Sequence, residues 1–309
     1  MNDCHEAQFN REPAWLPENQ VNGEIFGRKR LTPSSITATG LDSCSLGGKG
    51  HNVTFVLAIV SAFFAAILTF FTGFGLGTVL LAVFVLIFPI SVAIAATAVV
   101  HLSNNVFKLF LVGRHARKDI LIRFGIAALC AALAGAFLLN IIDSQQLIFN
   151  YEIGGRTLKT TPVRIVIGIL MALFALMDLF GISEKWVIEP EWMPIGGLLS
   201  GFFGGLSGNQ GAFRTMFLLK AGLTKEELIG TGAAIGCLVD IGRLTVYWKQ
   251  ISGPELSGHI ALLSAATLSA ISGTLIGNKL LKKMSLKKIE IAASVLLLAI
   301  AAGLATGLI

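Results

Sequence analysis

The sequence FFTGFGLGT at residues 70–78 decides the fold, because it interrupts a long apolar stretch with three glycines. A related sequence, FFGGLSGNQGAFR at residues 202–214, interrupts a second apolar stretch in the same way. Glycine-rich breaks inside apolar runs are typical of helices that are interrupted at membrane depth and line a cavity there. The two sequences therefore predict a polytopic, all-α integral membrane protein that uses one glycine-broken unit twice, once in each half.

The composition agrees with this prediction. Hydrophobic residues make up 54% of the 309 residues, charged residues only 14%, and the mean hydropathy is +0.76. Apolar runs of about 20 residues match a hydrocarbon core of about 30 Å. The runs give about eight to ten membrane segments. They lie at 53–71, 75–89, 91–112, 119–142, 163–182, 194–206, 211–222, 227–248, 259–280 and 289–309.

The chain divides into three parts. Residues 1–52 are polar and rich in Gly, Pro, Ser and Asn, which predicts a disordered tail. Residues 53–182 and 183–309 are the predicted first and second membrane repeats. Each half crosses the membrane an odd number of times, five if its broken pair spans fully and three if the pair is re-entrant. The second repeat is therefore predicted to be inverted relative to the first, which is a common plan in transporters.

Basic residues predict the orientation. The segments 114–118 and 282–288, together with Lys185 and Lys225, fall on one side of the predicted topology. The positive-inside rule makes that side cytoplasmic. On the other side, residues 151–159 flank two glycines and are expected to form a small β-hairpin.

Two predicted spans carry polar stripes, and ionisable groups inside a span are functional candidates. Spacings of three and four place each set on one helical face. The stripe in 91–112 consists of Thr97, His101, Asn104 and Lys108, flanked by Asn105. The stripe in 227–248 consists of Gly236, Asp240, Arg243 and Tyr247. We interpret both stripes as parts of a substrate site.

Structural roles compete with this interpretation. Asp240 and Arg243 are three residues apart and could form an ion pair that only stabilises the helix. Lys108 lies near a span end and could extend to the membrane interface. His101 and Asn104 could hydrogen-bond to neighbouring helices.

The glycine-rich breaks supply further candidates. A helix that starts inside the membrane offers free backbone N–H groups and the positive end of its dipole, which together favour an anion. The first break provides Thr72, Gly73, Gly75, Gly77 and Thr78. The second provides Ser207, Gly208, Asn209, Gln210 and Gly211, with Arg214 one turn further on. Close helix packing is the alternative explanation for these glycines.

Several other functions are excluded by the sequence. No phosphate-binding loop, paired-histidine metalloprotease helix or nucleophile elbow is present, so we expect no enzyme activity and no cofactor. The four cysteines are scattered, which predicts no metal site. The net charge of +6 resides mostly at the ends of apolar runs, so nucleic acid is not an expected partner.

The chain resembles the sulfite exporter TauE/SafE family of small-anion permeases over residues 53–309. The resemblance rests on the glycine-rich turns at 73–77 and 204–211, and on a threonine between small residues after each turn, Thr97 and Thr231. The basic segment 114–118 is also similar to a loop of the family. The resemblance implies a multi-pass permease of the inner membrane for sulfite, thiosulfate or sulfonates.

The second turn departs from the family pattern. Asn209 and Gln210 replace expected glycines, and Arg214 adds a charge, so the resemblance implies the class of substrate more closely than its identity. In the first turn, Leu76 interrupts the expected consecutive glycines.

The leading hypothesis is a transporter for a small anion, such as sulfite, a related sulfur oxyanion or a sulfonate, bound between two half-helix N-termini near the bilayer midplane. The expected partners are the lipid bilayer and the anion, and a homo-oligomer is left open. Two alternatives remain. One is a proton- or cation-coupled carrier that uses Asp240 and His101. The other is a membrane scaffold recruited through the N-terminal tail.

Overall fold

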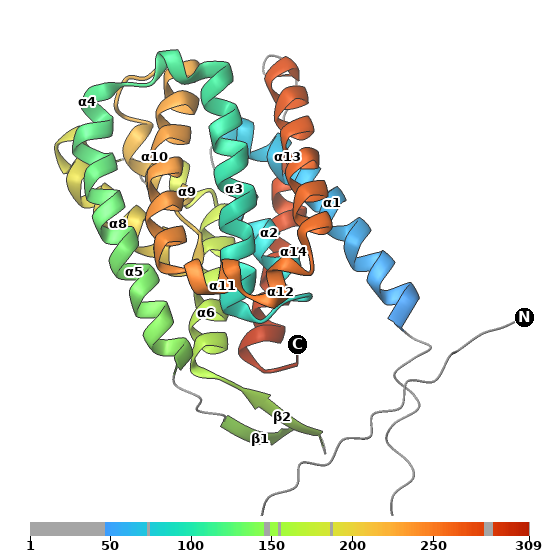
Figure 1. The fold of residues 1–309 in the computed structure, drawn as a ribbon. Helices are drawn as coiled ribbons and strands as arrows, with labels where there is room; N and C mark the ends of the chain where they lie inside the picture. The colour runs from blue at the N-terminus through green and yellow to red at the C-terminus, as the bar shows by residue number, and fades with distance from the viewer. Residues whose placement is uncertain are drawn as a thin grey trace, which may run out of the picture. The chain divides into compact units, whose positions relative to one another are not determined.

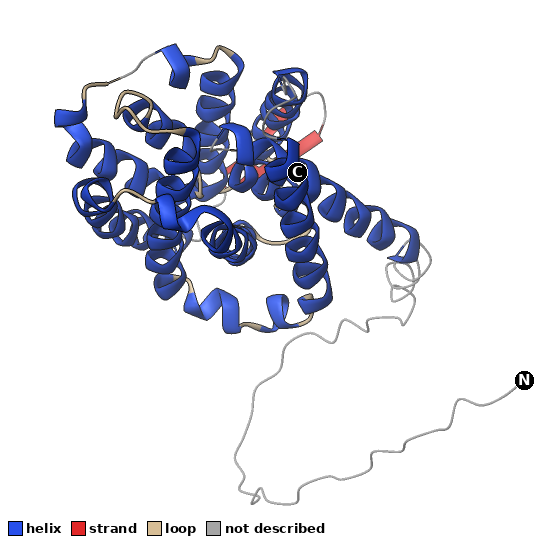
Figure 2. Cartoon of the chain, turned by 90° about the horizontal axis from the view of Figure 1, so that it is seen from above, coloured by secondary structure: helices blue, strands red, loops and turns tan. Residues whose placement is uncertain are grey.

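The computed structural model describes residues 47–72, 75–144, 149–153, 156–185, 188–280 and 287–308. Most of the predicted tail, and Gly73 of the first break, lie outside these residues. The described part is almost entirely helical, and Figure 2 shows the two short strands as its exception. The prediction of an all-α membrane fold is confirmed.

Each of the ten predicted segments corresponds to a helix. Those of the first half are α1 (Gly47–Thr72), α2 (Leu76–Phe84), α3 (Ile90–Val112), α5 (Ile126–Ser144) and α6 (Pro162–Leu179). Those of the second half are α8 (Met193–Ser207), α9 (Gly211–Leu218), α10 (Lys225–Val246), α13 (Ile260–Leu280) and α14 (Lys287–Ala305).

Short elements connect these helices. They are a 3₁₀ turn at Gly113–His115, α4 (Lys118–Ile120), a π turn at Leu121–Gly125, α7 (Ile182–Lys185), a 3₁₀ turn at Pro190–Trp192, α11 (Trp248–Ser252) and α12 (Pro254–Ser257). The predicted hairpin is confirmed as β1 (Phe149–Ile153) and β2 (Arg156–Thr160), which pair antiparallel. Figure 1 shows it at the end of the helical bundle opposite the α3–α4 connection.

Six helices in the described residues are long and apolar enough to cross a membrane. They cover Val53–Phe70, Ile90–His115, Lys118–Asp143, Pro162–Leu179, Lys225–Val246 and Ile260–Lys279. The broken helices α2, α8 and α9 are too short for this. At 1.5 Å per residue, the 15 residues of α8 extend only about 22 Å, against a core of about 30 Å.

The pair α8–α9 folds back on itself as a hairpin. The backbone N–H of Ile188, just before α8, donates to the carbonyl of Met216 near the end of α9 at 3.1 Å. Lys220, just after α9, pairs with Glu189. The entrance to α8 and the exit from α9 therefore lie at the same end of the bundle, and the break between them forms the tip of a hairpin.

The helices that carry the breaks pack on helices of the other half. On α8, a Cβ added to Gly201 or Gly205 would lie 2.1 Å from a backbone oxygen of α5, so only glycine permits this approach. On the other side, Gly273 of α13 meets the carbonyl of Phe63 in α1, where a Cβ would lie 2.3 Å from the oxygen. Each half thus supplies the partner for the other's broken helix. Two inverted copies would produce this exchange, and the inverted relation of the repeats 53–182 and 183–309 stays a prediction.

We expect Gly201→Leu to lower the free energy of unfolding by about 3 kcal/mol, because the backbone of α5 cannot move away as a flexible side chain can. Unfolding of the purified protein in mixed detergent micelles measures this. Gly113→Ala is the control, since its Cβ would meet only the flexible side chain of Leu109. Equal stability of the two variants would contradict the close packing.

Candidate functional site

The two glycine-rich breaks meet inside the bundle. A Cβ added to Gly77, in the first turn of α2, would lie 2.9 Å from the carbonyl oxygen of Gly208 at the tip of α8–α9. It would also lie 3.9 Å from Cδ2 of His101 on α3. The structure thus brings together two motifs that are more than a hundred residues apart in sequence, and the contact is made by main chain.

Gly208 has a second reason to be glycine. Its φ of 82° is in the left-handed region, and a Cβ there would lie 2.7 Å from Nη1 of Arg243. The guanidinium of Arg243 therefore rests against the tip of the second break. This links the polar stripe of α10 to the glycine turn.

Asp240 is the centre of a buried network. Its Oδ2 lies 2.6 Å from Nδ1 of His101 and accepts a hydrogen bond of 3.3 Å from Nδ2 of Asn105. Its Oδ1 accepts from Nε and Nη2 of Arg243 at 3.0 and 2.7 Å. Both Asp240 and Arg243 are 0% exposed. The ion pair considered as a structural role for Asp240 and Arg243 is present, and it holds Arg243 with Nη1 toward Gly208.

The remaining members of the α3 stripe have separate contacts. The amide oxygen of Asn104 accepts a hydrogen bond of 2.7 Å from Thr274 on α13, which is the interhelical role considered for it. Its Nδ2 has no partner among the described residues. The hydroxyl of Thr97 donates to the carbonyl of Ala93 in its own helix at 2.8 Å. Asn104 thus bonds to another helix and Thr97 bonds within α3, whereas His101 and Asn105 belong to the Asp240 network.

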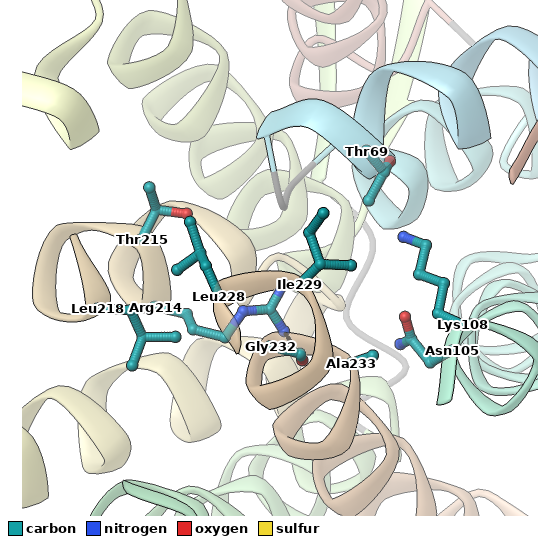
Figure 3. A pocket seen from close by; sticks show the side chains of 10 residues that line it. All are labelled: Thr69, Asn105, Lys108, Arg214, Thr215, Leu218, Leu228, Ile229, Gly232 and Ala233. Carbon is teal, nitrogen blue, oxygen red and sulfur yellow. Dashed lines mark hydrogen bonds between the residues drawn. The ribbon is translucent and has the colours of Figure 1, made fainter. Parts of the chain in front are cut away.

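Lys108 does not reach the surface of the protein, since only 3% of it is exposed. It lines a cavity of about 30 Å³ together with Arg214 of α9 (Figure 3). Nη1 of Arg214 donates to the carbonyl of Gly232 at 2.9 Å. The lining residues are Thr69, Asn105, Lys108, Arg214, Thr215, Leu218, Leu228, Ile229, Gly232 and Ala233. None of them carries a carboxylate.

The second break contains buried polar groups that lack partners. Asn209 is 4% and Gln210 is 2% exposed, and no side-chain polar atom of either finds a hydrogen-bond partner among the described residues. The hydroxyl of Ser207 instead donates to the carbonyl of Phe203 in α8 at 3.0 Å. Unpaired buried amides cost free energy, so they mark a place where a ligand would complete the hydrogen bonding.

The first turns of α2 and α9 share a small cavity of about 10 Å³ beside Asn209. It is lined by Thr78, Phe174, Asp178, Asn209, Gly211 and Ala212. Just before α2, Gly75 has a φ of 113°, in the region that favours glycine. The side chain of Thr72 lies outside the described residues.

Sequence reasoning missed Thr69 and Thr215, which line the larger cavity. Each hydroxyl donates to a carbonyl four residues earlier in its own helix, Ala65 and Gly211 respectively. Such threonines are common in membrane helices and give no local pattern that separates them from packing residues.

The model of the sulfite exporter TauE/SafE family matches residues 58–304. The chain belongs to this family. None of the curated proteins compared with the chain matches it. As a TauE/SafE protein with six apolar helices of spanning length in its described part, it is a multi-pass membrane transporter and not an enzyme. The resemblance seen in the glycine-rich turns is confirmed.

We expect Asp240→Asn to destabilise this TauE/SafE protein by about 3–5 kcal/mol, because Arg243 would be left as an uncompensated buried charge. The double variant Asp240→Leu, Arg243→Met should recover most of that loss. Unfolding in mixed micelles measures both. A double variant as unstable as the single one would show that the pair is not the source of the effect.

Proposed function

We propose that the chain carries a small sulfur oxyanion across the membrane and binds it where the tips of the two broken helix pairs meet. One observation carries the proposal. Around the Gly77–Gly208 contact, the buried amides of Asn209 and Gln210 and Nη1 of Arg243 all lack hydrogen-bond partners among the described residues. An oxyanion between the tips would accept hydrogen bonds from Asn209 and from the guanidinium of Arg243, which lies against Gly208.

The helix ends support an anion at this place. Neither Gly75 before α2 nor Gln210 before α9 caps its helix with a side-chain hydrogen bond. With no such cap from these residues, the first backbone N–H groups can donate to a ligand, and the first turns of both helices face one cavity. Two such ends and a guanidinium favour negative charge more strongly than either would alone.

The alternative of a cation carrier receives less support. Both oxygens of Asp240 are occupied, one by Arg243 and the other by His101 and Asn105. A cation would have to displace these donors, including a guanidinium. The scaffold alternative rests on the N-terminal tail, which lies outside the described residues up to residue 46. The inner-membrane location and a homo-oligomeric state stay predictions.

Asn209→Leu should lower sulfite flux into proteoliposomes by about tenfold or more, because a buried hydrogen bond to a charged ligand is lost. The same variant should unfold no more easily than the wild type, since the amide it removes has no partner among the described residues.

Asn140→Leu is the matched control. The amide of Asn140 is bonded to Val246 and Gln250, so this variant should lose stability yet carry sulfite at the wild-type rate per folded molecule. We call the anion site where the tips of the two broken helix pairs meet the tip site. Undiminished flux through Asn209→Leu would rule out both this residue and the tip site.

A further inference from the structure

The cavity between Lys108 and Arg214 is not part of the tip site. Figure 3 shows Lys108 entering it from α3 and Arg214 entering it from α9 on the opposite side. The hydroxyls of Thr69 and Thr215 donate to their own helices, so the two cations are the strongest donors that face this space. The cavity is therefore lined by two cationic side chains.

The buried charges in the described part of the chain do not balance. Three cations, Lys108, Arg214 and Arg243, are buried there against a single carboxylate, Asp240. Arg243 occupies that carboxylate in an ion pair. Lys108 has neither a hydrogen bond nor an ion pair within the described residues. Among the buried residues of the described part, cationic side chains thus outnumber carboxylates by two, and an anion beside Lys108 and Arg214 would offset that imbalance.

We infer that this cavity is a second anion site, which holds a compact inorganic sulfur oxyanion between Lys108 and Arg214. A volume of about 30 Å³ holds roughly two waters, which suits a small oxyanion and leaves no room for the organic tail of a sulfonate. The inference deepens the proposed function and rests on it for the class of anion.

One layer of side chains separates the second site from the tip site. Asn105 lines the cavity and donates to Asp240, which holds Arg243 against Gly208. The absence of a side chain at Gly236 makes this layer thin, since a Cβ there would lie 2.5 Å from Nδ2 of Asn105. An anion that leaves the cavity therefore meets the Asp240 network next.

The cavity lies toward the end of the bundle that carries the α3–α4 connection. Its lining includes Leu218 at the end of α9 and Leu228 in the first turn of α10. The next turn of α10 touches that connection, because a Cβ on Gly230 would lie 2.7 Å from the carbonyl of Val112. This end is the one predicted to be cytoplasmic. The second site would therefore bind an anion between the cytoplasm and the tip site.

Equilibrium binding of radiolabelled sulfite to the purified full chain tests the inference. The wild type should bind two sulfites per chain, and Lys108→Met, which keeps the length of the side chain, should bind one. In the wild type, methanesulfonate should displace the sulfite at the tip site, which is the one that Lys108→Met still binds. It should not displace the sulfite held by Lys108. Lys249→Met removes an exposed lysine and should still bind two. Two sulfites bound to Lys108→Met would overturn the inference.

Asn209→Leu separates this inference from the proposed function. It should retain the sulfite held by Lys108 while it loses flux. If Asn209→Leu transports normally and Lys108→Met loses one sulfite, the tip site is wrong and the cavity site stands. If Asn209→Leu loses flux and Lys108→Met changes neither binding nor flux, the reverse holds.

A measurement without ligand completes the test. In buffer free of oxyanions, Lys108→Met should raise the midpoint of thermal unfolding by about 2 °C or more, because an unpaired buried charge is removed. Sulfite should then stabilise the wild type more than the variant. A lower midpoint for Lys108→Met would mean that Lys108 stabilises the fold through a partner, and would overturn the second site.

Discussion

Helices that stop inside a bilayer leave backbone N–H and C=O groups that lipid cannot satisfy. In this protein α2 and α9 both begin within the bundle, where α2 packs on α1, α3 and α14 and α9 packs on α6, α7 and α8. Such an enclosure requires backbones to approach each other closely. Glycine permits this at Gly201 and Gly205 on α8 and at Gly273 on α13, where any side chain would collide with a carbonyl.

The same enclosure controls the electrostatics. Away from water, Arg243 is stable only because Asp240 accepts two of its hydrogen bonds, and His101 and Asn105 fix the other oxygen of that carboxylate. The network turns Nη1 of Arg243 toward the second break. Packing by glycine and orientation by the ion pair thus act on the same point, where the two halves of the chain touch.

The helices and the β-hairpin could be predicted from the sequence, because span length, hydropathy and glycine position are local properties. The faces of α3 and α10 that carry polar residues followed from spacings of three and four. The residues that these polar side chains contact on other helices did not follow from the spacing. His101 meets Asp240 because of how α3 is rotated against α10, and Lys108 shares a cavity with Arg214 because of how α3 is placed relative to α9. Local periodicity contains neither arrangement. Thr69 was missed because its hydroxyl donates within its own helix and gives no local pattern.

The contact between the tips has a consequence for how the protein opens. Gly77 meets the carbonyl of Gly208, so the barrier at this point is main chain and has no rotamers to change. A seal of aromatic or aliphatic side chains can be parted by turning one χ angle. At this contact no side-chain rotation can separate the two tips, so separating them would require α2 or the α8–α9 tip to move as backbone.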